Sequence, residues 1–328
     1  MSKLHAKIVG VGKYLPEKVL SNADLEKMVD TSDEWILKRV GIKERRICDN
    51  ETFASDLAYK ASENALKNAG MKADELDLII VSGVSPDMYT PSTSCLVQKK
   101  LGAINATAFD INAACSGFIF AITTATQYIE NGIYKNVLVI GSDTLSKVTE
   151  YQDRATCVLF GDGAGAAILQ ATDEETGVLS YFLGSDGASG DCLTLPGLKF
   201  DDIDKERRPY GNPHTIWMDG SAVFKFAVRV MESSSLKVVE DAGLTMDDIK
   251  ILVPHQANMR IIDGARKRLG LSEDRVFCNV DKYGNMSAAC VPIALCETIE
   301  EGKASKGDKV VLVSMGGGLT WGAVLIEL

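Results

Sequence analysis

The sequence has few histidines, no closely spaced cysteine pair and no long apolar run, and each shortage excludes a class of protein. Among 328 residues only three are histidine, so a metal site built from histidines is not expected. No segment reaches the apolar length that a membrane-spanning helix needs. None of the eight cysteines forms a C-x-x-C pair, and a chain of this size does not need disulfides for stability. We therefore expect reduced thiols and a cytoplasmic protein.

Positive charge is also in deficit. Lysine and arginine number 35 against 45 aspartate and glutamate, which gives a net charge of −10 and argues against general binding of nucleic acid. The segment Met1–Lys7 contains no apolar signal core, which fits a cytoplasmic location and no membrane partner. With 46% hydrophobic and 24% charged residues, the chain has the composition of a globular protein with a substantial core.

Two parts of the sequence repeat one pattern. Ala69–Val81 and Ala242–Pro254 each contain a helix end, a glycine stop, a short acidic turn and a buried strand. The offset between them is 173 residues, and the apolar runs Val137–Ile140 and Val310–Val313 keep the same offset. Any α/β protein repeats such units, but two elements with one offset favour an internal duplication. We predict two halves, residues 1–172 and 173–328.

Helical and strand patterns alternate along the chain, which is typical of an α/β fold. Two such halves, each with its own sheet, predict a five-layer α-β-α-β-α sandwich with the active site where the halves meet. The irregular stretch Asp186–Pro213 is predicted to be a surface excursion near the joint. The predicted helices are Ser21–Val29, Phe53–Ala69, Ser92–Leu101, Gly117–Glu130, Ala222–Ala242, Met259–Leu269 and Ser287–Glu301. The predicted strands are Lys7–Val11, Leu78–Val81, Val137–Gly141, Gly165–Leu169, Gly177–Leu183, Ile251–Val253, Val310–Ser314 and Gly322–Ile326.

Cys115 is the strongest candidate for a nucleophile. The apolar run Thr107–Ile111 precedes it and the helical pattern Gly117–Glu130 follows it, which places the thiol where a strand turns into a helix. At a helix N-terminus, unpaired N–H groups and the helix dipole favour thiolate, the nucleophilic form. Most cysteines are small buried hydrophobes, so this interpretation needs partners elsewhere in the chain.

Three further segments offer such partners. His255 directly follows the strand Ile251–Val253 and Pro254, at the edge where functional side chains gather in α/β folds. Asn285 precedes a helix in small-residue surroundings like those of Cys115. The run Gly316–Gly318 lies between two strands and is tight enough to bring backbone N–H groups to a ligand as an oxyanion hole. A structural histidine, a capping asparagine and a flexible turn are the alternative interpretations.

One glycine-rich segment is set aside. Gly161–Gly165 looks like part of a dinucleotide-binding loop, but it leads into an apolar strand and not into a helix. The dinucleotide interpretation therefore fails its structural context.

Taken together, the motifs of the chain resemble those of the β-ketoacyl-acyl carrier protein synthase III family. These are the initiating condensing enzymes of type II fatty acid synthesis, with a thiolase-like fold. The resemblance runs from end to end, and all its motifs occur in order. They are Asp30–Ile36, Gly41–Arg46, Ala113–Phe118, Phe160–Ala166, His255–Asn258, Gly284–Ser287, Gly316–Gly318 and Thr320–Gly322.

The resemblance implies a role for each candidate residue. Cys115 would take the acyl primer from acyl-CoA as a thioester, and His255 and Asn285 would stabilise the enolate formed when the malonyl group loses CO₂. The N–H groups of Cys115 and Gly318 would form the oxyanion hole. The product would be 3-oxoacyl-acyl carrier protein, made from malonyl-acyl carrier protein. No cofactor or metal is implied, because acyl-CoA is a substrate.

The same resemblance suggests how CoA is held. Trp35 would stack on the adenine with Arg154 on its other face, and Arg39 would lie near the phosphates. Without the resemblance, a core tryptophan and two solvated arginines would be the simpler interpretation.

A local basic cluster stands out in an acidic chain. It is a plausible dock for an acidic acyl carrier protein, although a solvated helix face would have the same composition. Its members are Arg260, Arg266, Lys267 and Arg268 on one predicted helix, with Lys225 as a further candidate.

The resemblance also separates this chain from neighbouring families. Thiolases carry a second reactive cysteine in the late glycine motif, where Ser314 and Met315 stand here. Elongating synthases use a second histidine, where Asn285 stands here. A polyketide-type condensing enzyme, an acyltransferase that forms no carbon–carbon bond and a non-catalytic scaffold remain as alternatives.

Thr90 matches a position at the end of the acyl pocket, where short-chain family members place an aromatic residue of the partner subunit. The resemblance thus implies a homodimer. Because threonine is smaller than an aromatic residue, we expect a deeper pocket that accepts primers larger than acetyl, including branched or medium-chain acyl-CoA.

Overall fold

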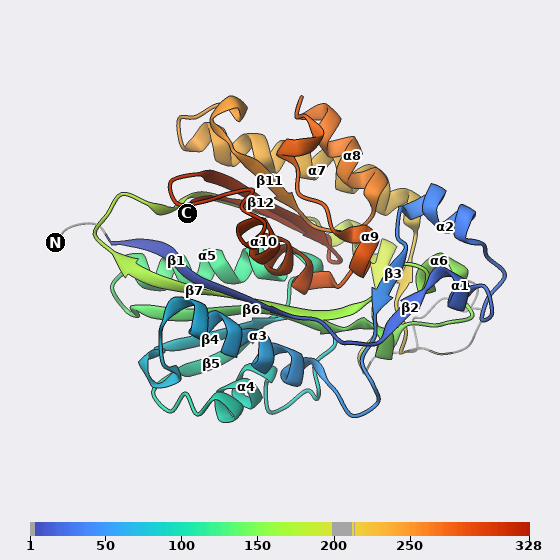
Figure 1. Ribbon diagram of the computed structural model, residues 1–328, viewed down its shortest axis with the longest axis horizontal. Helices are drawn as coiled ribbons and strands as arrows, with labels where there is room; N and C mark the ends of the chain where they lie inside the picture. The colour runs from blue at the N-terminus through green and yellow to red at the C-terminus, as the bar shows by residue number, and fades with distance from the viewer. Residues whose placement is uncertain (1–3, 199–211, 213) are drawn as a thin grey trace.

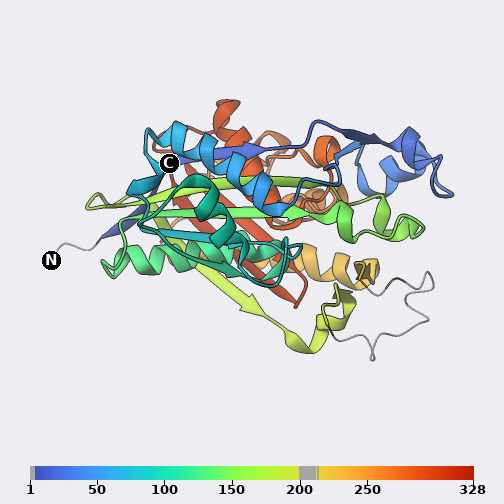
Figure 2. The same ribbon diagram turned by 90° about the horizontal axis from the view of Figure 1, so that it is seen from below.

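Two β-sheets with a layer of helices between them form the centre of the structure (Figures 1 and 2). The computed structural model describes residues 4–198, 212 and 214–328. The larger sheet has the strand order β1-β7-β6-β4-β5 and the smaller sheet the order β11-β12-β13-β8. The strands of the larger sheet are β1 (His5–Tyr14), β7 (Asp162–Thr172), β6 (Asn136–Thr144), β4 (Leu78–Ser82) and β5 (Thr107–Ile111). Those of the smaller sheet are β11 (Ile251–Pro254), β12 (Lys309–Gly316), β13 (Thr320–Glu327) and β8 (Gly177–Ser185).

Helices cover both outer faces and fill the space between the sheets (Figure 1). Helices α3 (Ala54–Ala69) and α4 (Thr93–Leu101) pack on the larger sheet, and α7 (Gly220–Asp241) packs on the smaller one with α8 (Met259–Arg268) beside it. Helices α5 (Gly117–Glu130) and α10 (Cys290–Glu300) lie in the middle and contact strands of both sheets. The predicted five-layer α-β-α-β-α sandwich is therefore confirmed.

The buried strands and middle helices follow from their composition. All five residues of β4 are buried, and its parallel pairing with β5 and β6 puts it inside a sheet covered on both faces. Helix α5 is apolar nearly all round, as a helix packed between two sheets must be. These middle elements carry the start of α5, and with it Cys115, into the interior.

The structure keeps the offset seen in the sequence. Strands β6 and β12 begin at Asn136 and Lys309, and the 3-10 turns η2 (Ala114–Ser116) and η7 (Ser287–Ala289) precede α5 and α10 at the same spacing of 173 residues. The expected boundary at 172/173 falls between β7 and β8, within a chain whose hydrophobic core includes residues from both sides. The division into two domains stays a prediction.

Every predicted strand lies within an observed one, but one predicted helix was too long and one helix was not predicted. The helix expected over Ser21–Val29 stops at Leu25, after the single turn α1 (Asn22–Leu25). A separate helix, α2 (Asp33–Val40), was not predicted, although the Ser32 side chain caps it by accepting from the Trp35 N–H at 3.1 Å. The remaining short elements are β2 (Val19–Ser21), β3 (Glu44–Arg46), η1 (Ala73–Glu75), η3 (Leu145–Val148), α6 (Arg154–Cys157), η4 (Gly187–Cys192), β9 (Leu193–Thr194), β10 (Trp217–Met218), η5 (Met246–Asp248), η6 (Glu273–Arg275) and α9 (Val280–Tyr283).

The irregular stretch Asp186–Pro213 is only partly the surface excursion that was predicted. Its first part forms η4 and then β9, which pairs with β10 and lies beside the interior cavity described below. Residues 199–211 and 213 of this stretch lie outside the described residues. Within the described part of the chain, no helix is long and apolar enough to cross a membrane, and no group of histidine, cysteine and acidic side chains is placed to hold a metal ion.

Candidate active site

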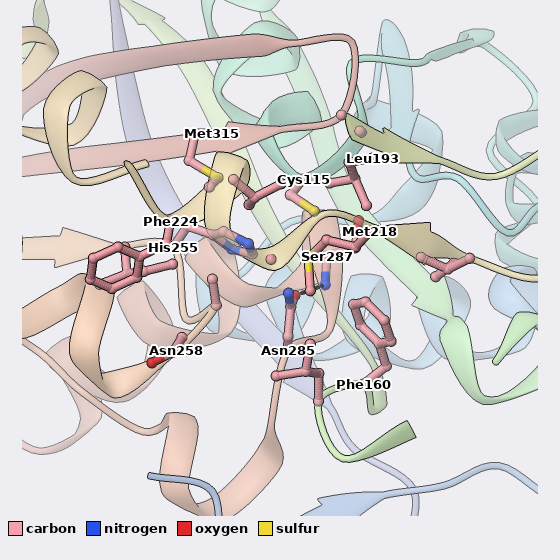
Figure 3. Close-up of a pocket in the computed structure, with 18 of the residues that line it drawn as sticks. Cys115, Phe160, Leu193, Met218, Phe224, His255, Asn258, Asn285, Ser287 and Met315 are labelled. Carbon is pink, nitrogen blue, oxygen red and sulfur yellow. Dashed lines mark hydrogen bonds between the residues drawn. The ribbon is translucent and has the colours of Figure 1, made fainter. Parts of the chain in front are cut away.

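A cavity of about 760 Å³ opens at the ends of the two middle helices, and residues from both halves of the chain line it. Cys115, His255 and Asn285 are all among these residues, although they are far apart in the sequence. Figure 3 shows the Cys115 sulfur, the His255 ring and the Asn285 amide facing one shared space. The structure thus brings together the three side chains that the sequence singled out separately.

Cys115 lies in the 3-10 turn η2, directly before α5. The turn is entered through Ala114, whose φ of 47° lies in the left-handed region. The Ser314 hydroxyl donates to the Cys115 carbonyl at 2.7 Å and ties this turn to β12. Gly316 at the end of β12 also packs here, since a Cβ at that position would lie 2.5 Å from the Cys115 nitrogen. Only glycine allows so close an approach of the strand.

The expectation of a resting thiolate was wrong. Burial raises the pKa of Cys115 to about 12, and the nearby Asp143 carboxyl raises it further, while an interaction with the Ser287 side chain opposes the shift. Removing the thiolate from water therefore outweighs what the helix N-terminus offers it. The free protein holds a protonated thiol at neutral pH, and its proton must leave before or during nucleophilic attack.

His255 is held by the backbone at the end of β11. Its N–H donates to the Val313 carbonyl at 2.8 Å, and the neighbouring Gln256 side chain donates to Pro254 and Phe277 carbonyls at 2.8 and 3.2 Å. The histidine is only 1% exposed, and its Nδ1 has no hydrogen-bond partner among the described residues. Burial lowers the pKa of His255 to about 3, so the imidazole is neutral at physiological pH.

The amide of Asn285 has a defined orientation. The Ser287 N–H donates to its Oδ1 at 2.9 Å, and the Cys290 Sγ lies 3.8 Å from the same oxygen. The backbone of Asn285 is fixed too, because its N–H donates to Leu159 at 2.8 Å and its carbonyl accepts from Gly161 at 3.0 Å. With Oδ1 occupied, the NH₂ end of the amide remains to donate into the cavity.

Gly318 also lines the cavity, as expected for an oxyanion-hole residue, and its φ of 132° is one that side chains rarely adopt. The sequence missed two other features of the site. Ser287 lies in the Gly284–Ser287 motif, and its place 173 residues after Ala114 was the available signal for it. An apolar wall was also missed, and two of its five residues come from the stretch interpreted as surface. It consists of Phe160, Leu193, Leu195, Ile216 and Met218.

Trp35, Arg39 and Arg154 all line the cavity as well. The Arg154 guanidinium lies over the Trp35 indole with its carbon 4.8 Å from the ring centroid, and its Nη1 donates to the Asp30 carbonyl at 2.8 Å. An aromatic ring bound between the two groups requires them to separate. Arg39 is exposed. The three residues predicted to hold CoA are therefore neighbours of one cavity.

The predicted basic cluster divides into two parts. Lys225 and Arg260 line the cavity, and the Arg260 guanidinium carbon lies 5.4 Å from the centroid of the Phe224 ring. The other three side chains pair with carboxylates away from it. Arg266 and Lys267 each bind Asp263 at 2.6 Å, and Arg268 binds Glu232 at 2.6 Å.

Thr90 does not line the cavity of its own chain. It is exposed, in the loop before α4. A role at the end of the acyl pocket therefore depends on a second subunit.

Comparisons with known proteins agree with this geometry. A family model described as 3-oxoacyl-[acyl-carrier-protein (ACP)] synthase III matches residues 109–187, and a model of the C-terminal part of the same enzymes matches residues 239–328. The β-ketoacyl-[acyl-carrier-protein] synthase III of Caldanaerobacter subterraneus is 53% identical, over 99% of this chain and 98% of that protein. The protein of the same name from Clostridioides difficile is also 53% identical, over 98% of each chain.

Solved structures give the same result. The 3-oxoacyl-[acyl-carrier-protein] synthase III of Aquifex aeolicus is 46% identical, with a TM-score of 0.92 over 98% of this chain and 100% of that one. The priming β-ketosynthase of the R1128 polyketide pathway has the same TM-score at 34% identity, over 99% of this chain and 96% of that one. The fold is the thiolase-like fold of these enzymes, and the chain belongs to the β-ketoacyl-[acyl-carrier-protein] synthase III family.

Proposed function

We propose that the protein condenses an acyl-CoA primer with malonyl-acyl carrier protein, with loss of CO₂, and so starts fatty acid synthesis. Membership of the synthase III family makes it an acyltransferase of fatty acid biosynthesis. The observation that carries the proposed mechanism is one cavity that contains a thiol, a neutral imidazole and an oriented amide, with Trp35 and two arginines along its wall.

In the first step, the sulfur of Cys115 attacks the acyl carbon of acyl-CoA. The bond between that carbon and the CoA sulfur breaks, CoA leaves and takes up a proton, and an acyl thioester remains on Cys115. The developing oxyanion is held by the N–H groups of Cys115 and Gly318 in this proposal. Splitting the condensation through a covalent thioester replaces one difficult step by two easier ones.

In the second step, the malonyl thioester loses CO₂ and becomes an enolate, whose carbon attacks the acyl group on Cys115. A neutral His255 and the NH₂ end of Asn285 donate hydrogen bonds to the enolate oxygen. Donors that carry no charge suit an oxygen whose negative charge is transient. The thioester bond to the Cys115 sulfur breaks, the product leaves as 3-oxoacyl-acyl carrier protein, and the released thiolate takes up a proton from solvent to restore the thiol.

The decisive experiment is acylation of the intact protein by acyl-CoA, followed by mass spectrometry of its peptides. We expect one acyl group per chain, on the peptide that contains Cys115. The Cys115→Ala variant should lose both the mass shift and condensation. A suitable control is Cys95→Ala, since Cys95 is partly exposed on α4 and does not line the cavity.

Two results would contradict the proposal. One is full condensation by the Cys115→Ala variant. The other is acyl transfer to the carrier protein without release of CO₂, which would identify an acyltransferase that forms no carbon–carbon bond. Loss of activity in the Cys95→Ala variant would show that thiol loss alone does not identify the nucleophile.

We further infer that the protein forms a homodimer through the free edge of its larger sheet. Strand β5 ends this sheet and pairs only with β4 among the described strands. An unpaired edge of this kind is a template for pairing with another chain. Large apolar side chains are exposed in the loops next to β5 and α4, with Tyr89 73% and Ile104 82% accessible. Dimerisation there would bury them and place Thr90 at the subunit interface.

A further inference from the structure

A buried carboxyl group next to the candidate nucleophile has no role in the mechanism above. Asp143, in β6, is 0% exposed. Its Oδ1 accepts from the Val84 N–H at 2.7 Å, the Ser85 N–H at 2.9 Å and the Ser85 hydroxyl at 2.7 Å. Its Oδ2 accepts from the Ala288 N–H at 3.3 Å. Burial raises the pKa of Asp143 above its ordinary value, which makes its carboxylate a stronger base, and the donors on both oxygens oppose this shift.

Ser287 is close to both groups, because the next residue, Ala288, donates to Asp143 and Ser287 itself lies beside Cys115 in the cavity (Figure 3). Burial raises the pKa of both Cys115 and Asp143, and the nearby Ser287 hydroxyl opposes the shift in each case. The hydroxyl is buried and has no hydrogen-bond partner among the described residues, so it is available to reorient. Ser287 also lines the cavity beside Cys115 and Asn285 (Figure 3).

The fold does not require a hydroxyl at this position. Ala114, the residue 173 positions earlier, enters the matching turn η2 with a φ of 47°, and Ser287 enters η7 with a φ of 50°. The left-handed turn is therefore common to both halves, but only one of them has a hydroxyl there. Nor does Asn285 need the hydroxyl, because the Ser287 backbone N–H holds the amide.

We propose that Ser287 and Asp143 form the path by which the Cys115 thiol loses its proton during acylation. The Sγ proton passes to the Ser287 oxygen while the hydroxyl proton passes to Asp143 Oδ2, as the sulfur attacks the acyl carbon. When the bond to the CoA sulfur breaks, the proton passes back from Asp143 through Ser287 to the leaving CoA thiolate. The Asp143 carboxylate is thereby restored. In this path Ser287 exchanges a proton directly with the reacting thiol and is a catalytic residue, and Asp143 acts through it.

Other titratable groups around Cys115 fit this role less well. His255 faces the thiol from the end of β11, but burial lowers its pKa to about 3, which makes it a weak base. Cys290, in α10, is another thiol whose pKa burial raises. Asp143 is thus the acidic group near the thiol whose ionised form is held by several donors.

The proposal rests on the function proposed above, but it can be tested separately from it. Alkylation of Cys115 by iodoacetamide, followed on its own peptide from pH 6 to 10, needs no acyl-CoA. The informative variant is Ser287→Gly, because glycine adopts a φ of 50° without strain and keeps the backbone N–H that holds Asn285. We expect its alkylation at pH 7 to be slower than in the wild type and to recover as the pH rises.

In the same variant, the single-turnover rate of acylation by acyl-CoA should fall on the order of 10²-fold at pH 7, the size of a typical proton-transfer contribution. Release of CO₂ from malonyl-acyl carrier protein should change little. Asp143→Asn should slow acylation in the same direction, and the double variant should be no slower than the worse single one. Ser116→Ala is the matched control, since that buried hydroxyl donates to the Ala113 carbonyl at 2.7 Å.

Two results would overturn the proposal. One is a Ser287→Gly alkylation profile equal to that of the wild type. The other is an equal loss of acylation and CO₂ release, which would show that the hydroxyl only supports the site. If the wild type is alkylated on Cys115 but never acylated by acyl-CoA, the proposed function fails while the proton path is still decided by the alkylation profile.

Discussion

At the scale of single residues, burial sets the protonation of the site. It raises the pKa of Cys115 to about 12 and lowers that of His255 to about 3, so both side chains are uncharged at neutral pH. Reacting side chains without charge suit a reaction whose charges appear only transiently, first on the attacked carbonyl and then on the enolate. Fixed neutral donors stabilise such charges without having to reorganise.

The buried neutral His255 predicts a specific loss of stability in acid. The pKa of His255 in the folded protein, about 3, lies below the ordinary value of 6.5. Between these pH values the unfolded chain binds a proton at His255 and the folded chain does not. The contribution of neutral His255 to the free energy of unfolding is fully present above pH 6.5 and is lost as the pH falls towards about 3. For this one proton the free energy of unfolding should fall by up to about 1.4 kcal/mol per pH unit in that range.

The measurement is urea unfolding of the wild type and of His255→Gln at pH 7, 6 and 5. The difference in unfolding free energy between the two should shrink as the pH falls, because glutamine does not titrate. His5→Gln is the control, since His5 is partly exposed at the start of β1. A difference that stays constant from pH 7 to 5 would show that His255 is protonated as readily in the folded protein as in the unfolded chain.

Residue types and motifs predicted which side chains meet, but not their electrostatics. Cys115, His255 and Asn285 were each recognisable from a strand end or a helix start. The state of the thiol was not, because desolvation depends on what packs around it from distant segments. Ser287 was missed for the same reason, since the role proposed for it depends on its being near both Cys115 and Asp143.

At the scale of elements, the end of β12 must pass very close to the turn that holds the nucleophile. An added methyl group on Gly316 would lie 2.5 Å from the Cys115 nitrogen. We expect Gly316→Ala to lower the free energy of unfolding by about 1–3 kcal/mol, as overpacking typically does. Single-turnover acylation should slow as well, because η2 moves when the strand is pushed away.

The chain offers a matched control for this substitution. A Cβ on Gly187 would meet no atom within 4 Å, so Gly187→Ala should keep both the stability and the acylation rate of the wild type. Urea unfolding and acylation kinetics on the two variants test the difference. Equal behaviour of the two would mean that the approach of β12 to η2 is looser than the structure indicates.

Helices and strands with a regular apolar pattern could be predicted from the sequence. Those that form only because a distant segment pairs with them could not. The buried strand β4 and helix α5 could be bounded from their residues alone. Helix α2 has only eight residues and is mostly exposed, so few apolar positions mark it in the sequence. Strand β9 has only two residues and exists because β10, after the undescribed residues, pairs with it.

At the scale of the whole molecule, the internal offset was the most productive sequence signal. It predicted two sheets and a site between the halves, because equal halves bury their helices against one another. It could not predict the differences between the halves. β5 extends the first sheet beyond β4, whereas the matching edge of the second sheet ends at β11.

The proposed dimer predicts how primer length is selected. If Thr90 of one subunit reaches the cavity of its partner, Thr90→Phe should shorten the pocket. The kcat/KM for branched and medium-chain primers should then fall at least about tenfold while that for acetyl-CoA is retained, since the loss is that of one or two buried methylene groups. Lys306→Phe, at another exposed position, is the control. A strict acetyl preference in the wild type, or a monomer in light scattering, would contradict the prediction.

The division of the basic cluster predicts which charges guide the carrier protein to an enzyme of net charge −10. Lys225 and Arg260 line the cavity, whereas Lys267 already pairs with Asp263. Lys225→Glu and Arg260→Glu should each raise the KM for malonyl-acyl carrier protein on the order of tenfold, because a favourable charge contact becomes a repulsive one. Lys267→Glu should change it much less.

The discriminating substrate is a malonyl thioester of N-acetylcysteamine, which has the reacting group but no protein surface. With it, Lys225→Glu should turn over as the wild type does, and high salt should bring the wild type's KM for the carrier protein towards that of the variant. If Lys267→Glu raises that KM as strongly as Lys225→Glu, the carrier protein contacts the far end of α8 and the first prediction is wrong. Equal losses with the small thioester would instead mean that Lys225 acts on the reacting group itself.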